Sequence, residues 1–291
     1  MGSYITQALL KTNKHKITAV TRARADSSSK FPEGVIVKEV NYDDQPSLVE
    51  ALEGQHVLVI LMSVTVPPNT QDKLIRAAAE AGVPWVLPSE WAGDPKEVEL
   101  GKGIFVGPQK QATRDLIDSI GKSSWIGMVA SFWYEFSLAG SPTRFGFDFF
   151  NRAVTFYGEG TEVINVSTYG QCARAVANLL SLKILPENEN DKSPTLSQFK
   201  NNFVYLSSFA ISQKDMFDSV LRVTGTTEKD WKINYQDCKE RYDKGIAKLQ
   251  NGDRDGFEQA MYVRIFFPVV KEIMRRKDYY ITISWGCPRR T

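Results

Sequence analysis

The segment GPQKQATRDLIDSIG, residues 107–121, contains two basic side chains whose spacing is compatible with a role in catalysis. Lys110 and Arg114 are four residues apart, so a helix presents both on one face. A lysine that is partly removed from water beside a bound ligand loses its proton more easily and can act as a general acid or base. Most lysines on amphipathic helices only face solvent, and the spacing alone leaves both interpretations open.

Arg22 is a second candidate, because it ends the short β-rich run ITAVTR. Ligands of open parallel sheets bind beyond the carboxyl ends of the strands. An acidic residue at this position would accept a hydrogen bond from the 2′-hydroxyl of NAD, whereas an arginine offers a planar fork to the 2′-phosphate of NADP. Arg24 and Lys30 add positive charge to the same loop, and a solvated basic loop is the alternative interpretation.

Other side chains that could take part in catalysis give weaker signals. Ser89 and Glu90 follow an apolar run, at a strand tip where site residues are expected. Tyr134 could donate a proton, but its aromatic-rich surroundings are typical of packing or of a substrate-pocket lining. The chain has only 2 histidines, His15 and His56, which excludes a histidine-rich metal site and gives little support to a Ser-His triad. We therefore expect no metal.

The elements that must position these residues alternate along the first 130 residues. Apolar runs predict strands at 16–21, 35–42, 56–63, 83–89 and 123–131, and amphipathic patterns predict helices at 3–12, 46–54, 70–82 and 108–121. Ser3 is a candidate N-cap of the first helix, which leaves Gly2 just outside it. Helices that alternate with apolar strands imply a parallel sheet with right-handed crossovers. The predicted fold class is α/β, with a doubly wound parallel sheet.

This alternation stops after about residue 131. AVTFYGEGTEVINVS, residues 153–167, predicts two short strands around a glycine turn, and 201–208 predicts another strand. Helices are predicted at 168–182, 211–225, 237–250 and 256–275. We predict a parallel α/β domain at 1–131 and a smaller mixed α/β domain at 132–291, with helix 168–182 packing back on the first domain.

Composition narrows the class of protein. The 291 residues carry a net charge of +2, which gives no general attraction to nucleic acid or to an anionic membrane. No uncharged apolar stretch reaches the length of a membrane span, and the start lacks the pattern of a signal peptide. Cys172, Cys238 and Cys287 are widely spaced, as expected for free thiols in a reducing compartment, so we expect a cytoplasmic protein.

Six segments together resemble the NmrA-like and isoflavone-reductase-like branch of the atypical short-chain dehydrogenases. They are ITAVTR, VNYDDQPSLVEALEGQHVLVI, LIRAAAEAGVPWVLPSEWAG, KQATRDLIDS, SSWIGMVASFWYEFSL and VSTYGQCARAVANLLSL. The resemblance covers nearly the whole chain and is specific as a combination, although each piece alone is weak. The variants LPSEW and FWYEFSL are similar to those of fungal members.

The resemblance implies an NADP-binding Rossmann-type domain at 1–131 and a substrate domain at 132–291. It also implies an NADP-dependent reductase that transfers hydride to a small aromatic or conjugated substrate. It implies Lys110 as the general acid or base, in place of the usual Tyr-x-x-x-Lys pair. The expected cofactor contacts are Gly2 from the last glycine of the GxxGxxG loop, Arg22 and Lys30 at the 2′-phosphate, Ser63 and Val64 along the pyrophosphate and nicotinamide, and Phe132 and Trp133 beside the nicotinamide. We expect Trp91 and Tyr134 to line the substrate pocket.

The sequence departs from the family at its start. The family's first strand and two of its three loop glycines have no counterpart, and that strand is central in the usual order. Three explanations are open. The sequence starts at an internal methionine of a longer protein, in which case this chain alone binds NADP weakly or not at all. Alternatively, the strands at 16–21 and 56–63 close the gap directly, or the apolar segment 279–286 fills it.

Two rival functions also stay open. NmrA-like proteins include redox sensors that bind a dinucleotide without turnover and regulate a protein partner. A truncated, inactive fragment is the third possibility. Lys110 favours catalysis over sensing, and on that basis we expect a small-molecule substrate rather than a nucleic acid or a membrane as the partner.

Overall fold

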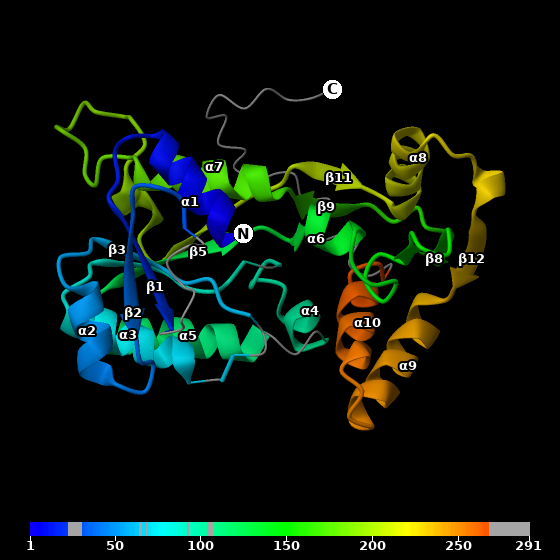
Figure 1. Cartoon of the computed structure of the whole chain (residues 1–291), viewed down its shortest axis with the longest axis horizontal. Helices are drawn as coiled ribbons and strands as arrows, with labels where there is room; N and C mark the ends of the chain where they lie inside the picture. The colour runs from blue at the N-terminus through cyan, green and yellow to red at the C-terminus, as the bar shows by residue number, and fades with distance from the viewer. Residues whose placement is uncertain (23–30, 64–65, 68, 92, 104–106, 268–291) are drawn as a thin grey trace.

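A four-stranded parallel sheet forms the centre of the first half of the chain, in the order β10-β5-β4-β3 (Figure 1). The computed structural model describes residues 1–22, 31–63, 66–67, 69–91, 93–103 and 107–267. The strands are β3 (Val57–Val59), β4 (Trp85–Leu87), β5 (Ser124–Val129) and β10 (Asn202–Tyr205). Trp85, Val86 and Leu87 are all buried, as expected for a strand covered on both faces. The predicted α/β class with a parallel sheet is confirmed.

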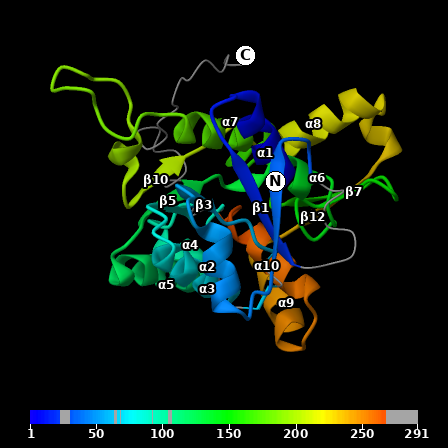
Figure 2. The ribbon, with the colours of Figure 1, turned by 60° about the vertical axis from the view of Figure 1, so that its left-hand side comes forward.

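Helices cover both faces of this sheet (Figure 2). On one face, α1 (Gly2–Lys11) packs beside α7 (Tyr169–Leu180), and Ile5, Cys172 and Val176 join a buried cluster with the strands. The other face is covered by α2 (Gln45–Leu52), α3 (Thr70–Glu80) and α5 (Gly107–Ile120), which contribute to a second buried cluster. Helix α7 thus packs on the sheet of the first half, although it comes from the second half of the sequence.

The strands β1 (Ile17–Arg22) and β2 (Val35–Val40) form a separate parallel pair. Ile17 packs in the cluster beneath α1 and α7, and Val20 packs in the cluster of α2, α3 and α5. The pair therefore lies between the same two helical layers as β3. Among the described residues, β1 and β3 belong to different sheets and do not pair with each other. The expectation that these two strands close the gap directly is therefore wrong. Segment 279–286 lies outside the described residues.

The first helix begins one residue earlier than its sequence indicates. Its N-cap is Met1 and Gly2 is the first helical residue, so Ser3 lies inside the first turn and caps nothing. The predicted end of the helix at 70–82 agrees better with the structure. Gly82 follows α3 with a φ of 74°, a left-handed conformation that favours glycine.

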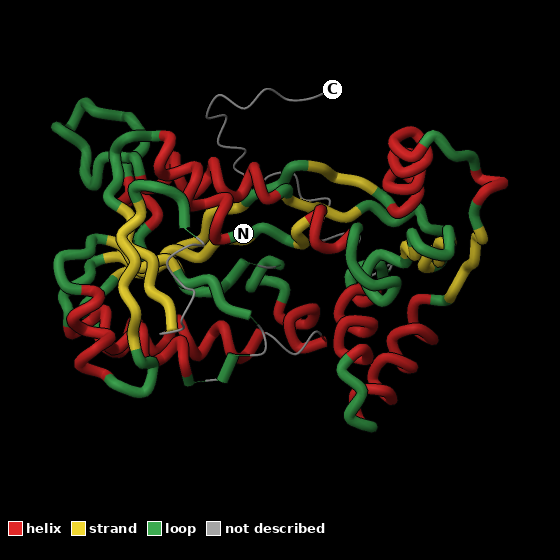
Figure 3. Tube along the Cα trace, viewed as in Figure 1, coloured by secondary structure: helices red, strands yellow, loops and turns green. Residues whose placement is uncertain are grey.

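Two three-stranded sheets organise the second half (Figure 3). One contains β6 (Phe132–Trp133), β9 (Ile164–Ser167) and β11 (Phe209–Ile211), and the other contains β7 (Phe147–Asp148), β8 (Ala153–Tyr157) and β12 (Lys232–Gln236). Strands β8 and β9 belong to different sheets, so the two strands predicted around the glycine turn do not pair with each other. The helices and 3-10 turns are α4 (Val98–Gly103), α6 (Tyr134–Leu138), α8 (Gln213–Thr224), α9 (Cys238–Gln250), α10 (Asp255–Arg264), η2 (Leu196–Phe199) and η3 (Glu228–Asp230).

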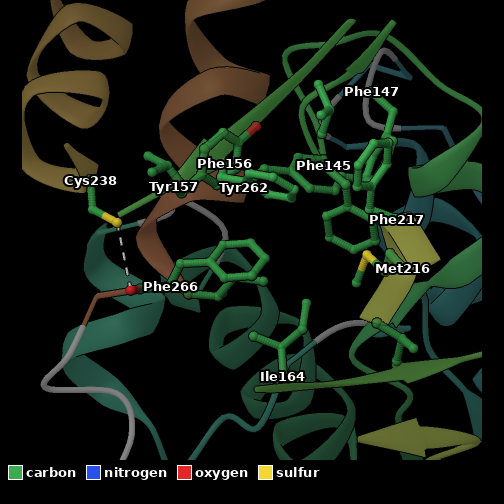
Figure 4. Close-up of a cluster of buried hydrophobic side chains, with 14 of the residues drawn as sticks. Phe145, Phe147, Phe156, Tyr157, Ile164, Met216, Phe217, Cys238, Tyr262 and Phe266 are labelled. Atoms are coloured by element: carbon green, nitrogen blue, oxygen red, sulfur yellow. Dashed lines mark hydrogen bonds between the residues drawn. The ribbon is translucent and has the colours of Figure 1, made fainter. Parts of the chain in front are cut away.

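An aromatic core holds the second half together (Figure 4). Phe145, Phe156 and Phe266 are almost fully buried in it, with Tyr262 packed edge-on against Phe145. The thiol of Cys238 donates to the carbonyl of Phe266. Burial raises the pKa of Cys238 to about 11, so the thiol stays protonated and acts as a packing group.

Buried cysteine and the absence of candidate metal sites limit the chemistry open to the described residues. Cys172 is free and buried, and burial raises its pKa to about 12, so it is not a reactive thiolate. Within the described ranges, no group of three or more histidine, cysteine or acidic side chains is arranged to hold a metal ion. No described helix is both long and apolar enough to cross a membrane.

The interrupted sheet leads to a prediction about hydrogen exchange. The Ile60 N–H donates to the Leu87 carbonyl at 2.8 Å, and successive residues of a strand point to opposite sides, so the amides of Val59 and Leu61 point away from β4. We expect these amides to exchange at least about tenfold faster than those of Val86 and Leu87. Amide hydrogen exchange followed by mass spectrometry or NMR checks this. Equal protection on both sides of β3 would contradict an open edge.

Candidate active site

Helix α5 carries Lys110 and Arg114 on one face, as the spacing predicts, and that face meets the end of β4. Glu90 follows β4, and Arg114 Nη1 donates to both of its carboxylate oxygens, at 2.7 and 2.6 Å. The side chains of Arg114 and Glu90 are only 6% and 3% exposed. Arg114 Nη2 donates to Gln111 Oε1 at 2.6 Å, which fixes the guanidinium to its own helix. The result is a buried ion pair that joins α5 to the strand tip.

Aromatic rings and one glycine complete the surroundings of this pair. The Arg114 guanidinium lies 5.2 Å from the Phe203 ring centroid and 5.7 Å from that of Trp125. A Cβ at Gly127 would lie 2.5 Å from the Phe203 ring and 3.3 Å from Glu90 Oε2. Only glycine at position 127 leaves room for the ion pair and the ring above it.

Lys110 is the charged group beside this pair that has no bonded partner among the described residues. Its side chain is half-buried, so it remains accessible at one side. Burial lowers its pKa to about 8; the Glu90 carboxylate opposes this change and the Arg114 guanidinium adds to it. A lysine with such a pKa exchanges a proton near neutral pH, which a general acid or base must do.

A hydrogen-bond network ties the ends of β3 and β4 to the helices that follow them. Gln71 of α3 accepts from the Ser89 N–H at 2.8 Å, and its amide donates to Thr113 Oγ1 of α5 at 3.0 Å. The Met62 N–H donates to Ser89 Oγ at 3.3 Å. The strand tips are therefore held rigidly next to Lys110, and Ser63 lies exposed just beyond Met62.

Arg22 lies where the sequence predicts it, at the carboxyl end of β1, opposite Val40 of β2. Its side chain is exposed, and its charge lowers the pKa of the nearby Tyr42, although burial raises that pKa by more. Among the described residues, no hydrogen bond or ion pair connects Arg22 with Lys110. Lys30 and Val64, the other predicted contacts on this side, lie outside the described residues.

The start of α1 lies close to the end of β3 and to Trp133. A Cβ at Gly2 would lie 3.8 Å from Leu61 Cδ1, an ordinary contact distance. Tyr169 connects the two regions, with ring centroids 5.2 Å from Tyr4 and 5.6 Å from Trp133. Trp133 Nε1 is buried and donates to no acceptor among the described residues. A buried N–H without an acceptor is uncommon in proteins.

The aromatic candidates separate into two groups. Phe132 and Trp133 are neighbours in β6, but Phe132 packs with Tyr262 in the second-half core and Trp133 packs in the cluster beneath α1 and α7. The two neighbouring rings therefore pack in different clusters, and their contacts with the nicotinamide stay a prediction. Tyr134 is half-buried, and its ring packs edge-on against Phe209.

Trp91, which the sequence places in the substrate pocket, is 8% exposed and packs among the residues beneath α1 and α7. Its indole Nε1–H donates to the Ile60 carbonyl at 3.1 Å. Both its ring and its polar atom help to pack the sheet, and its contact with a substrate stays a prediction.

The sequence interpretation missed Gln71, because nothing in an amphipathic helix marks one polar residue as a tertiary link. Glu90 and Arg114 were both singled out from the sequence, as a strand-tip residue and as the i, i+4 partner of Lys110, but their ion pair was not predicted. Their contact spans 24 positions, and only the packing of α5 against β4 brings them together.

The sequence of the chain is similar to those of known proteins. The model of the NmrA-like family matches residues 1–139. The chain is similar to oxidoreductase aprR of Aspergillus flavus, with 27% identity over 268 residues that cover 90% of this chain and 82% of the relative.

Solved structures with the same fold include two reductases. AtPrR2 with NADP+ and (+)pinoresinol has a TM-score of 0.66 and 22% identity, covering 91% of this chain and 82% of that chain. The NADPH-dependent quinone oxidoreductase QOR2 of Escherichia coli has a TM-score of 0.69 and 18% identity, covering 100% of this chain and 92% of that chain. Together with the match over residues 1–139, these findings confirm the resemblance of the chain to the NmrA-like and isoflavone-reductase-like proteins.

Proposed function

We propose that the chain is an NADP-dependent reductase of small aromatic or conjugated substrates. The observation that carries this proposal is the half-buried Lys110, which forms no ion pair with the described part of the chain. It has a pKa of about 8 and lies at the carboxyl end of the parallel sheet. The similar structures support it, because one was solved with NADP+ and (+)pinoresinol and another is an NADPH-dependent quinone oxidoreductase. Such substrates carry oxygen atoms that can accept a proton from a lysine.

Several residues fit a bound dinucleotide. Arg22 presents an exposed guanidinium at a strand end, which suits a 2′-phosphate. The start of α1 at Gly2 suits the pyrophosphate, because the first N–H groups of a helix point toward an anion. The unpartnered Trp133 Nε1–H suits an acceptor at the nicotinamide end. Ser63 is exposed just beyond the end of β3, between these two ends.

NADPH, when bound, supplies the hydride. The chain's own residues then have two tasks, to hold the reactants and to deliver a proton. Lys110 gives a proton from Nζ to the substrate oxygen or carbon that becomes basic during reduction, and water restores the proton afterwards. Because the acid form is needed, reduction is fastest below pH 8 and declines as the pH rises through the Lys110 pKa.

The proposal is tested by NADPH oxidation with a panel of quinones, enones and enol ethers. The full chain should reduce at least one class, and the rate should depend on Lys110. A matched control is Lys232→Ala, which removes an exposed lysine of β12 and should leave the rate unchanged. Tight NADP binding without turnover of any substrate would contradict the reductase and favour a dinucleotide-binding sensor.

Cofactor preference provides a separate prediction at Arg22. We expect Arg22→Asp to weaken NADPH binding by about tenfold or more and to leave NADH binding equal or better, because the arginine's charged hydrogen bonds to the phosphate are replaced by repulsion. Titration of both nucleotides by calorimetry checks this, with Arg254→Asp as a control at an exposed position of the α9–α10 turn. Equal NADPH affinity before and after the change would reject the role of Arg22.

A further inference from the structure

Glu90 and Arg114 are buried charges that the proposed reaction does not use directly. Both are almost fully buried, and such charges are retained only when they are paired. Within the described residues, the charges that act on Lys110 come from these two side chains, Glu90 after β4 and Arg114 one turn along α5. Their arrangement therefore decides whether Lys110 is free or bound.

The distances show which cation holds the carboxylate. Arg114 Nη1 lies 2.7 and 2.6 Å from the two oxygens of Glu90. Lys110 makes no ion pair with Glu90 in the structure, although it lies one helical turn before Arg114. The permanently charged arginine satisfies the carboxylate, and the lysine is left without a bonded partner.

We propose that Glu90 and Arg114 are a positioning pair for Lys110, in which Arg114 holds the Glu90 carboxylate so that Lys110 Nζ stays free to exchange a proton with the substrate. The inference rests on the proposed proton transfer and assigns two further residues to it. Gln111 and Gly127 support the pair, the first by accepting from Arg114 Nη2 and the second by leaving space beside Glu90.

Removal of Arg114 and removal of the Glu90 charge should shift the pKa of Lys110 in opposite directions. Without Arg114, the buried carboxylate has only Lys110 as a nearby cation, and the repulsion by the guanidinium is also lost. Both changes favour the charged lysine. Without the Glu90 charge, Lys110 faces an uncompensated guanidinium, which favours the neutral lysine. Removal of both charges cancels the two effects and leaves burial as the main influence on the pKa of Lys110.

The experiment compares Arg114→Met, Glu90→Gln and the double variant, with Arg254→Met as a matched surface control. The pH dependence of Lys110 acetylation by acetic anhydride is measured by mass spectrometry on the full chain without cofactor or substrate, and exposed Lys232 is the internal reference. We expect the Lys110 midpoint to rise by about one pH unit or more in Arg114→Met and to fall by a similar amount in Glu90→Gln. The double variant should return to within about half a unit of the parent.

The outcomes separate this inference from the proposed function. Opposite shifts with recovery in the double variant support the pair, and they do so even if no substrate is ever reduced. Unchanged midpoints, or shifts in the same direction for both single variants, would overturn it even if NADPH-dependent turnover is found. If Arg114→Met does not fold, Glu90→Gln and the double variant still decide, because a fall followed by recovery is required. In an active preparation, the high-pH limit of the rate should move with the labelling midpoint.

Discussion

Replacement of Lys110 by alanine should lower kcat of NADPH-dependent reduction by about 10²–10⁴-fold, the usual contribution of a positioned acid or base. The nucleotide affinity should change little, because the proposal assigns Lys110 to the substrate and Arg22 to the nucleotide phosphate. Stopped-flow measurement of NADPH oxidation, together with a separate binding titration, distinguishes the two effects.

The pH profile gives this prediction a second readout. Burial lowers the pKa of Lys110 to about 8, so the protonated form needed for reduction is lost as the pH rises above that value. Lys110→Arg keeps the positive charge but cannot release the proton, so it should remain slow at every pH. A Lys110→Ala variant with the parent's kcat would show that the proton comes from elsewhere.

Removal of Arg114 should have the largest effect on stability. Arg114→Ala removes the guanidinium that bonds to the buried Glu90 carboxylate and leaves Lys110 as the nearby cation. Breaking a buried ion pair in this way costs about 3–5 kcal/mol in the free energy of unfolding. For a chain of this length, a loss of that size lowers Tm by roughly 10 °C. Thermal and denaturant unfolding, followed by circular dichroism, measure the loss.

Two controls define the physical cause of that loss. Lys239→Ala breaks an exposed pair with Asp243, whose atoms lie 2.6 Å apart, and should cost less than about 0.5 kcal/mol. The double replacement Glu90→Leu with Arg114→Met should recover most of the lost stability, because apolar residues of similar size avoid the cost of buried charge. If Arg114→Ala were as stable as the parent, the pair would not be buried as the structure shows.

The periodic parts of the fold could be predicted from the sequence. The helices around Thr70–Glu80 and Gly107–Ile120 have regular apolar spacing, and their positions agree with the structure within a few residues. The face shared by Lys110 and Arg114 also follows from spacing alone. Local periodicity is sufficient for these features because each depends on residues only a few positions apart.

Features that depend on distant packing were not predictable in the same way. Trp91 looked like a pocket aromatic, yet the sheet buries it and its indole bonds to Ile60. The 153–167 segment contains two strands, and each has one partner, β12 or β11, that comes from residues more than 40 positions later. The separation of β1 from β3 likewise depends on which segments are available to pair, and no periodicity in either strand shows it.

The interrupted sheet makes cofactor binding the central question for this chain. In the proposed arrangement, Arg22 acts from one side of the interruption, and Ser63 and Lys110 act from the other. A dinucleotide that spans both sides would link the β1–β2 pair to the rest of the sheet. Binding should therefore slow hydrogen exchange in β1 as well as around Trp133.

Titration of the full chain with NADPH and with NADH, followed by nucleotide fluorescence, tests the central claim most directly. The account predicts saturable NADPH binding, with energy transfer from tryptophan to the nicotinamide and an affinity about tenfold or more above that for NADH. No saturable binding of either nucleotide at millimolar concentration, or equal binding of both, would contradict it.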